Sequence, residues 1–197
     1  MIPALLLACA PEVAPATLEA VIQVESGGDP FAVNVNRFGG PQPHATDLKD
    51  AARQAERFIT RGYSVDIGLM QVNSRNLAAL GYTVRQVLDP CTNIRGGATI
   101  LAADYVRAVQ TYGSGQRALQ AALSAYNTGD FYRGFANGYV ARYYGPRVPA
   151  VAAALRPALE AHPATARTAS QPVRSILDPY TSDSSIYARE VLNVRVQ

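Results

Sequence analysis

The chain has 197 residues, 48% of them hydrophobic, and a formal net charge of +3. This length and apolar content suit one domain with a proper core, and they argue against a second full domain. The basic residues are scattered singly rather than gathered in a stripe, so we do not expect nucleic acid as a partner.

The first nine residues, MIPALLLAC, contain a short apolar run that ends in a small residue and a cysteine. A truncated signal or a lipoprotein-type cleavage site has this appearance, but the segment lacks a positively charged start and its apolar run is short. We therefore expect the chain to begin near a mature domain, with any export signal removed or absent. No stretch approaches the roughly 20 apolar residues of a membrane span.

The cysteines and histidines give no sign of a metal site. Cys9 and Cys91 form no CxxC motif, and His44 and His162 lie far apart in the sequence. We expect no metal and no cofactor. From the residues alone, the two cysteines fit equally one disulfide in an oxidising compartment or two buried thiols. A disulfide would close a loop worth on the order of 4 kcal/mol in chain entropy.

The first predicted helix runs from about Thr17 to Gly27, and its apolar face ends in an acid. The i, i+3, i+4, i+7 positions of this face are Leu18, Val21, Ile22 and Glu25. Burial disfavours a charged carboxyl, so the pKa of Glu25 should be raised, as a general acid requires. The structural alternative is that Glu25 lies at the helix end and turns outward to solvent.

A loop and a second helix are expected next. Residues 29–45 are rich in Asn, Gly and Pro, which is typical of a loop or a short irregular hairpin. Residues 46–62 have helical apolar spacing between a Thr cap and a terminal Gly. Residues 62–73 alternate like a strand that is interrupted at Gly68. A short helix over residues 74–80 follows.

Two longer helices are predicted in the second half of the chain. Thr83 and Gln86 match a capping box for a short turn before them. The apolar spacing then predicts helices over residues 93–112 and 116–127, and the second places Tyr126 on its apolar stripe. This stripe directs Tyr126 toward the interior.

The last part of the chain differs in composition. A final helical region is expected within residues 139–159. Residues 161–197 are rich in Thr, Ser, Ala, Arg and Pro, which predicts a poorly ordered tail. We therefore expect a mainly α domain over residues 1–160, with a small irregular or β segment at residues 63–73.

Four separated signals stand in order along the chain: Glu25-Ser26, Gly68-Leu69-Met70-Gln71, Asn93-Ile94 with Gly97, and Ala125-Tyr126-Asn127 followed by Gly129. Together they resemble the soluble lytic transglycosylases, whose helical catalytic domain is similar to goose-type lysozyme. The match DIGLMQVN over residues 66–73, with Asp-Pro-Cys over residues 89–91, resembles the branch associated with type IV secretion and conjugation. The resemblance covers roughly residues 9–145 and leaves the tail unexplained.

This resemblance implies a lysozyme-like fold, a disulfide between Cys9 and Cys91, and a periplasmic location. It also implies cleavage of the β-1,4 bond between MurNAc and GlcNAc in peptidoglycan, with 1,6-anhydro-MurNAc ends. Glu25 would protonate the leaving oxygen and then, as a carboxylate, accept the proton of the muramyl C6 hydroxyl that attacks C1. The wall would thus be opened locally for a type IV secretion or conjugation apparatus.

The resemblance further implies a set of substrate-binding residues. They are Ser26, Gly68, Met70, Gln71, Asn73, Tyr126, Asn127 and Tyr139. Gln71 and Asn73 would offer amide hydrogen bonds to N-acetyl or hydroxyl groups, and Gly68 would let the backbone approach a sugar. Met70 would pack under a sugar or simply fill a gap in the core.

Aromatic residues of the second half have expected roles as well. Tyr126 would orient Glu25 or stabilise charge at the reacting sugar, and Asn127 would support the turn or contact the glycan. The chain has no Trp, so stacking on a sugar would fall to Tyr139 or Tyr143.

Alternative functions depend on whether a second carboxylate takes part. Asp66 is the nearest candidate, although a turn-capping or solvated Asp is the simpler explanation. A hydrolytic muramidase would need Asp66 or another acid to position water. A non-catalytic wall-binding or assembly factor would keep the cleft without depending on Glu25. Peptidoglycan strands are the expected partner, and the tail is left as a contact for envelope secretion components.

Overall fold

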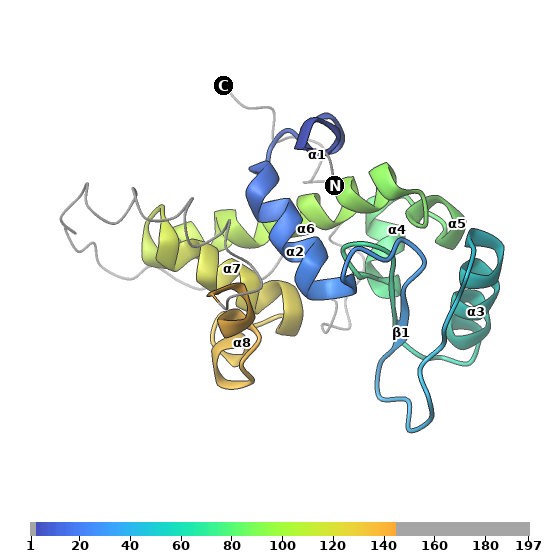
Figure 1. Ribbon diagram of the computed structural model, residues 1–197. Helices are drawn as coiled ribbons and strands as arrows, with labels where there is room; N and C mark the ends of the chain where they lie inside the picture. Colours follow the sequence, from blue (N-terminus) through green and yellow to red (C-terminus); the bar gives the residue numbers. More distant parts are fainter. Residues whose placement is uncertain (1–2, 145–197) are drawn as a thin grey trace. The chain divides into compact units, whose positions relative to one another are not determined.

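The computed structural model describes residues 3–144, which divide into two compact units. Unit 1 comprises residues 3–99 and unit 2 comprises residues 100–144, with the boundary inside a long helix (Figure 1). The predicted tail and the end of the last predicted helical region lie outside the described residues. The expected mainly α fold with a small β segment is confirmed.

The helices of unit 1 surround a small sheet in the sequence order. They are α1 (Pro3–Cys9), α2 (Pro15–Ser26), α3 (Leu48–Thr60), the 3-10 helix η1 (Ser74–Asn76), α4 (Leu77–Leu80), α5 (Val84–Val87) and the first part of α6 (Pro90–Tyr112). The predicted capping box is present, because the Thr83 and Gln86 side chains each bond the other's backbone at the start of α5. None of the helices within residues 3–144 is long and apolar enough to cross a membrane.

Three helix starts differ from the prediction. Helix α2 begins at Pro15 rather than Thr17, and α6 begins at Pro90 rather than Asn93. A proline in the first turn has a helical φ and lacks an N–H that the helix leaves unpaired there anyway. Helix α3 is capped by Asp47 rather than Thr46, since the Asp47 carboxylate accepts a bond from the backbone of Asp50 at 2.8 Å.

The strands β1 (Val33–Val35), β2 (Val65–Ile67) and β3 (Val72–Asn73) form an antiparallel sheet in that order. The segment predicted as a loop over residues 29–45 therefore contributes a strand. The sheet has an apolar face of buried residues, namely Val33, Val35, Val65, Ile67 and Val72. Its opposite face is polar, because Asn34, Asp66 and Asn73 are paired side by side across the three strands.

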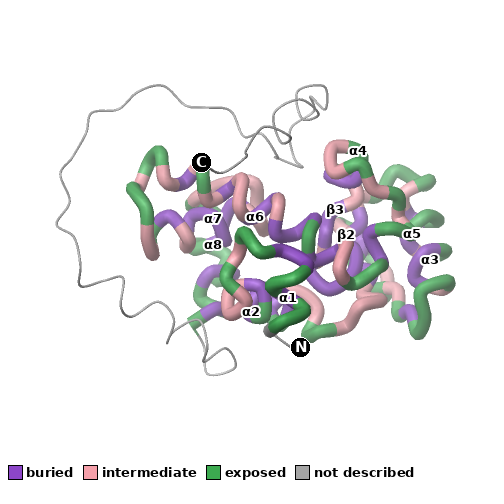
Figure 2. Tube along the Cα trace, turned by 90° about the horizontal axis from the view of Figure 1, so that it is seen from above, coloured by how far each residue is buried: buried purple, intermediate pink, exposed green. Residues whose placement is uncertain are grey.

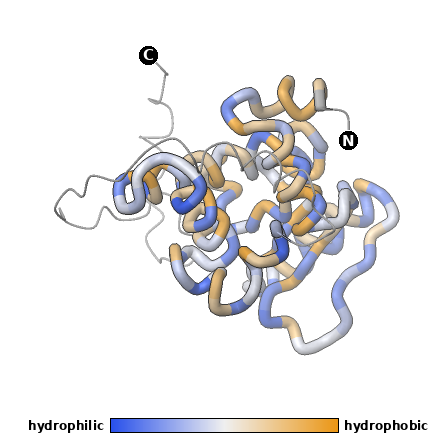
Figure 3. The backbone as a smooth tube through the Cα atoms, turned by 60° about the vertical axis from the view of Figure 1, so that its left-hand side comes forward, coloured by the Kyte–Doolittle hydropathy of each residue, from blue (hydrophilic) through white to orange (hydrophobic). Residues whose placement is uncertain are grey.

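Helix α1 occupies the segment that we compared with a signal. Figure 3 shows this helix, beside the N label, in the orange of hydrophobic residues. Leu6 is buried, whereas Leu5 and Leu7 are exposed. The disulfide implied by the resemblance is present, and Cys9 at the end of α1 is bonded to Cys91 in the first turn of α6.

Unit 2 contains the rest of α6, α7 (Gln116–Thr128), α8 (Arg133–Ala136) and the 3-10 helix η2 (Val140–Tyr144). Its core contains the small residues Ala108, Ala118 and Ala121, with Tyr105, Val109, Tyr112 and Phe131 packed against them. Buried and exposed residues alternate along α7 in Figure 2, as expected for an amphipathic helix. Helix α8 was not predicted, because four residues that include Gly134 carry no periodic signal.

Candidate active site

Glu25 is the penultimate residue of α2. The helix ends at Ser26 because Gly27 adopts a left-handed φ of 65° and its N–H bonds Gln23 O. Glu25 is half-buried, which lies between the buried acid and the solvent-facing acid considered from the sequence. The carboxyl is therefore close to the surface on a rigid element.

Ser26 joins the end of α2 to the segment Gly68–Gln71. Its Oγ donates a hydrogen bond to Leu69 O at 2.7 Å, across 43 positions of sequence. The same Oγ accepts a bond from the backbone N–H of Gly28 at 3.1 Å. The predicted neighbourhood of Glu25 and this segment is thus built by a direct bond from the adjacent residue.

The segment Gly68–Gln71 is a strained turn between β2 and β3. Gly68 has a φ of 75° and Gln71 a φ of 49°, which is unfavourable for a residue with a side chain. The Gln71 Nε2 donates to Gly68 O at 2.9 Å and to Ala32 O at 3.3 Å. The Gln71 amide hydrogens therefore hold the turn against the start of β1, in addition to any contact with a sugar.

Asn93 supports the turn from below and is 1% exposed. Its Oδ1 accepts from the Met70 N–H at 2.8 Å, and its Nδ2 donates to Ile67 O and Val87 O, both at 2.8 Å. These bonds use both hydrogens of the amide, as burial of a polar side chain requires. Asn93 is thus a structural member of the ordered motif set.

Met70 is fully buried. A Cβ on Gly97 would lie 2.7 Å from both Cβ and Sδ of Met70, so this glycine makes room for the methionine. The gap-filling role considered from the sequence accounts for this position. Gly68 is also buried, and it faces the Asn93 amide.

Asp66 lies on the polar face of the sheet. Its Oδ1 accepts from Asn73 Nδ2 at 2.6 Å, and its Oδ2 accepts from Asn36 Nδ2 at 2.8 Å. Burial raises the pKa of the Asp66 carboxyl, and the hydrogen bonds from Asn36, Asn73 and Asn34 only partly oppose this effect. Asp66 is therefore neither a turn cap nor a freely solvated charge, contrary to the simpler explanation.

Asn73 is committed to the same network. Besides Asp66, its side chain bonds the Ser64 hydroxyl and accepts from the Arg75 N–H at 3.0 Å. With 8% of its surface exposed, it acts first as a support of the sheet. Direct bonding to a sugar by Asn73 stays a prediction.

In unit 2, Tyr126 and Asn127 lie in the last turn of α7 and are half-buried. Gly129 ends this helix with a left-handed φ of 72°, and its N–H bonds Ala125 O at 2.7 Å. Tyr139 is 3% exposed, and its hydroxyl lies 2.5 Å from that of Tyr143. The two tyrosines predicted for sugar stacking therefore pack edge-on against each other.

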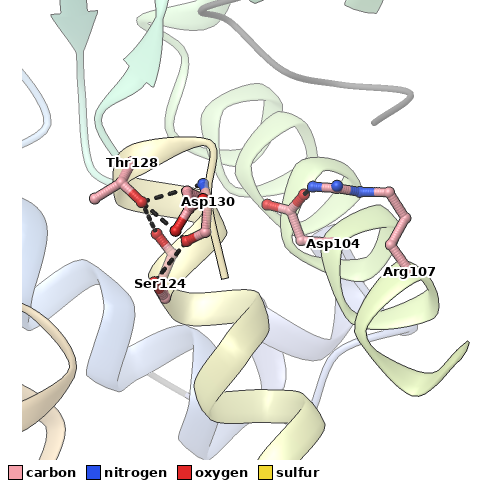
Figure 4. Close-up of polar contacts among 5 residues, drawn as sticks. All are labelled: Asp104, Arg107, Ser124, Thr128 and Asp130. Atoms are coloured by element: carbon pink, nitrogen blue, oxygen red, sulfur yellow. Dashed lines mark hydrogen bonds and ion pairs between the residues drawn. The ribbon is translucent and has the colours of Figure 1, made fainter. Parts of the chain in front are cut away.

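A hydroxyl network follows the Tyr126-Asn127 turn (Figure 4). The fully buried Ser124 donates to Asp130 O at 2.6 Å and accepts from the Gly134 N–H at 2.8 Å. Thr128 Oγ1 accepts from the Asp130 N–H at 3.1 Å. These bonds return the chain tightly to α7, so that α8 packs on it.

Sequence reasoning missed the residues that start α8. The Asp130 carboxylate accepts from the N–H groups of Tyr132 and Arg133, at 2.8 and 2.9 Å, and these bonds lower its pKa. An Asp placed three residues before the second of these donors is a capping signal that the composition of the loop concealed. Figure 4 also shows the buried pair of Asp104 and Arg107, 2.6 Å apart.

Each unit thus brings together one part of the predicted set. Unit 1 joins Glu25 and Ser26 to the strained turn and to the Asp66 network, whereas unit 2 holds Tyr126, Asn127 and Tyr139. Within residues 3–144, no three His, Cys, Asp or Glu side chains are grouped so that they could hold a metal ion. The chemistry available is that of a half-buried acid on a rigid helix end.

The description "Transglycosylase SLT domain" matches residues 5–143, so the chain belongs to this family and the resemblance is confirmed. Among its particular relatives, it is 43% identical over 155 residues to "Protein virB1" of Agrobacterium fabrum, covering 79% of this chain and 60% of the relative. It is 43% identical over 141 residues to "Type IV secretion system protein virB1" of Brucella suis biovar 1, covering 68% of this chain and 58% of the relative.

The "Protein virB1" of Rhizobium radiobacter is 40% identical over 156 residues, which cover 79% of this chain and 64% of the relative. The chain therefore spans about 60% of the length of these curated relatives. No solved structure matches the chain.

Proposed function

We propose that the chain is a lytic transglycosylase that cleaves the β-1,4 bond between MurNAc and GlcNAc in peptidoglycan. Membership of the SLT family supports the activity. The observation that carries the assignment of Glu25 is the hydrogen bond from Ser26 Oγ to Leu69 O. It fixes the helix end that bears the acid against the strained turn, so Glu25 is the carboxyl that this architecture positions most firmly.

Glu25 acts twice in the proposed reaction. The protonated carboxyl first gives its proton to the glycosidic oxygen as the bond from C1 to that oxygen breaks. The resulting carboxylate then takes the proton of the muramyl C6 hydroxyl while O6 bonds to C1. The 1,6-anhydro ring closes without water, and Glu25 is again protonated. Half-burial supports the first step, because partial desolvation favours the neutral acid.

The site of action that we propose is the periplasmic wall, opened locally for a type IV secretion or conjugation apparatus. The printed names of the Brucella relatives support this context. The disulfide between Cys9 and Cys91 supports an oxidising compartment. We further propose a catalytic domain over residues 1–160, with residues 161–197 as a tail for contacts with secretion components.

The test is digestion of purified peptidoglycan, with mass spectrometry of the muropeptide ends. The wild-type protein should release 1,6-anhydro ends, and Glu25→Gln should abolish them. Glu19→Gln is the matched control, because Glu19 lies on the same helix but is exposed. Its products should equal those of the wild type. Anhydro products from Glu25→Gln at the wild-type rate would remove Glu25 from its role.

A hydrolytic muramidase is the second candidate, and the Asp66 network is the observation that favours it. A desolvated carboxyl held by two carboxamides is a group that can position water or stabilise a sugar cation. Reducing ends from the wild type, lost in Asp66→Asn, would support hydrolysis instead. No products at all from the wild type would support a non-catalytic wall-binding or assembly role.

A further inference from the structure

Three residues of unit 2 are linked by hydrogen bonds in series. The backbone N–H of Tyr139 donates to Asn137 Oδ1 at 2.9 Å. Asn137 Nδ2 in turn donates to Asn127 Oδ1 at 3.2 Å. Asn137 follows α8 directly, and Asn127 lies in the last turn of α7. The series thus connects the predicted substrate residue Asn127 to the backbone of Tyr139.

The direction of each bond follows from the donor at the start. A backbone N–H can only donate, so the atom of Asn137 that faces Tyr139 must be its carbonyl oxygen. The NH2 group of Asn137 then lies on the other side, where it faces Asn127. Because an NH2 group can only donate, Asn127 must turn its own carbonyl oxygen toward Asn137. The backbone N–H therefore sets the orientation of two carboxamides.

We propose that Asn137 is a positioning residue that makes Asn127 present its NH2 group, rather than its carbonyl, to the carbonyl oxygen of an N-acetyl group on the glycan. This inference rests on the proposed function. Without the series, the Asn127 carboxamide would be free to turn over, since its two orientations have nearly the same shape. An NH2 group carries two hydrogens, so another contact of Asn127 within the protein leaves its donor character unchanged.

The surroundings of the series hold both ends in place. Ser124 is bonded to Gly134 and Asp130, and a Cβ on Gly134 would lie 2.6 Å from the Ser124 Cα. Helix α8 therefore cannot move away from or closer to α7 without losing these contacts. At the other end, Tyr139 is buried against Tyr143. Asn137 itself is exposed, so it is open to substitution with little effect on the core.

Asn137→Asp tests the proposal by reversing the second bond. An aspartate still accepts the Tyr139 N–H, but it offers an oxygen to Asn127. The Asn127 carboxamide should then turn over to donate its NH2 to this oxygen, and it would present its carbonyl to the glycan. We expect KM for glycan strands to rise five- to tenfold, with kcat changed less than twofold and with urea unfolding close to that of the wild type.

Three comparisons separate positioning from a general effect. Gln110→Glu adds the same charge at an exposed site of α6, and its KM should equal that of the wild type. Asn137→Ala leaves Asn127 without a fixed orientation, so its KM should lie between the wild type and Asn137→Asp. In an Asn127→Ala background, Asn137→Asp should have no further effect on KM, because it acts through Asn127.

Nuclear magnetic resonance of the side-chain amides provides a readout that does not depend on activity. The NH2 resonances of Asn127 should shift in Asn137→Asp, because this group becomes a donor to a carboxylate. A KM within twofold of the wild type, additive effects in the Asn127→Ala background, or unshifted Asn127 resonances would overturn the proposal. If the wild type does not cleave glycan, the proposed function fails by itself, and the amide resonances still decide whether the series exists.

Discussion

The Asn93 carboxamide fills the space that a side chain on Gly68 would need. A Cβ on Gly68 would lie 2.9 Å from Asn93 Cγ, and closer still to Nδ2. The amide cannot move aside cheaply, because it is bonded to Met70, Ile67 and Val87. The glycine of the strained turn is thus required by its neighbour as well as by its own φ.

Gly68→Ala should therefore destabilise the protein by about 2–4 kcal/mol, since a left-handed residue with a Cβ is strained and the core is overpacked. Urea unfolding measures this loss. Gly62→Ala is the matched control, because Gly62 has a φ of 86° but open space around it. It should lose about 1 kcal/mol, from backbone strain alone. Equal losses at both positions would contradict a role for Asn93.

Ser26→Ala should lower kcat about tenfold while costing about 1 kcal/mol of stability. The variant loses the bond to Leu69 O, so the helix end that carries Glu25 is held less firmly. Steady-state kinetics on glycan strands, together with urea unfolding, measure both effects. Ser114→Ala, at an exposed position, serves as control and should change neither. A full kcat in Ser26→Ala would show that the Glu25 helix end needs no such support.

Asp66 should make stability depend on pH. The folded state raises the pKa of this carboxyl above its ordinary value of 3.8, so the folded state favours the protonated form. The contribution of Asp66 is thus fully present below the unfolded pKa and is lost as the pH rises through the folded pKa. The unfolding free energy of Asp66→Asn, relative to the wild type, should therefore increase between about pH 4 and pH 7.

Urea unfolding of both proteins at several pH values measures this difference, in which the other titrating groups cancel. Asp47→Asn is a control at an exposed cap, and it should not reproduce the same rise. A difference between Asp66→Asn and the wild type that stays constant with pH would show that burial does not govern this carboxyl.

The disulfide should contribute strongly to stability. Replacing Cys9 and Cys91 by alanine removes a cross-link between residues 82 positions apart, and the loss should be about 4 kcal/mol by loop-closure entropy. Thermal unfolding with and without reductant measures it. Reductant should lower the Tm of the wild type and leave that of the double variant unchanged. An equal response of both proteins would mean that the cross-link is absent in solution.

The long helices could be predicted because apolar spacing repeats over many residues, as in α3 and α7. Their first residues were misplaced where a proline opens the helix, at Pro15 and Pro90. Proline reads as a breaker in a linear sequence, although a helix tolerates it in the first turn. Strand β1 was missed, because three residues show no alternation and the strand exists through its pairing with β2.

The candidate site was predictable in its members more than in their roles. The order of the motifs identified Glu25 and the turn at Gly68, since both depend on residues adjacent in sequence. The bond from Ser26 to Leu69 and the bonds around Asp66 connect distant segments, which no local pattern encodes. The burial of Met70 likewise depends on Gly97 in another helix.

The cross-link between Cys9 and Cys91 also governs what a protease could do to this protein. Glu25 and the Gly68–Gln71 turn both lie between the two cysteines in sequence. The segment of residues 36–47, largely exposed between β1 and α3, lies inside the same covalent ring (Figure 1). A single cut there would open the ring without releasing a fragment, so the acid and its turn would stay in one molecule until the disulfide is reduced.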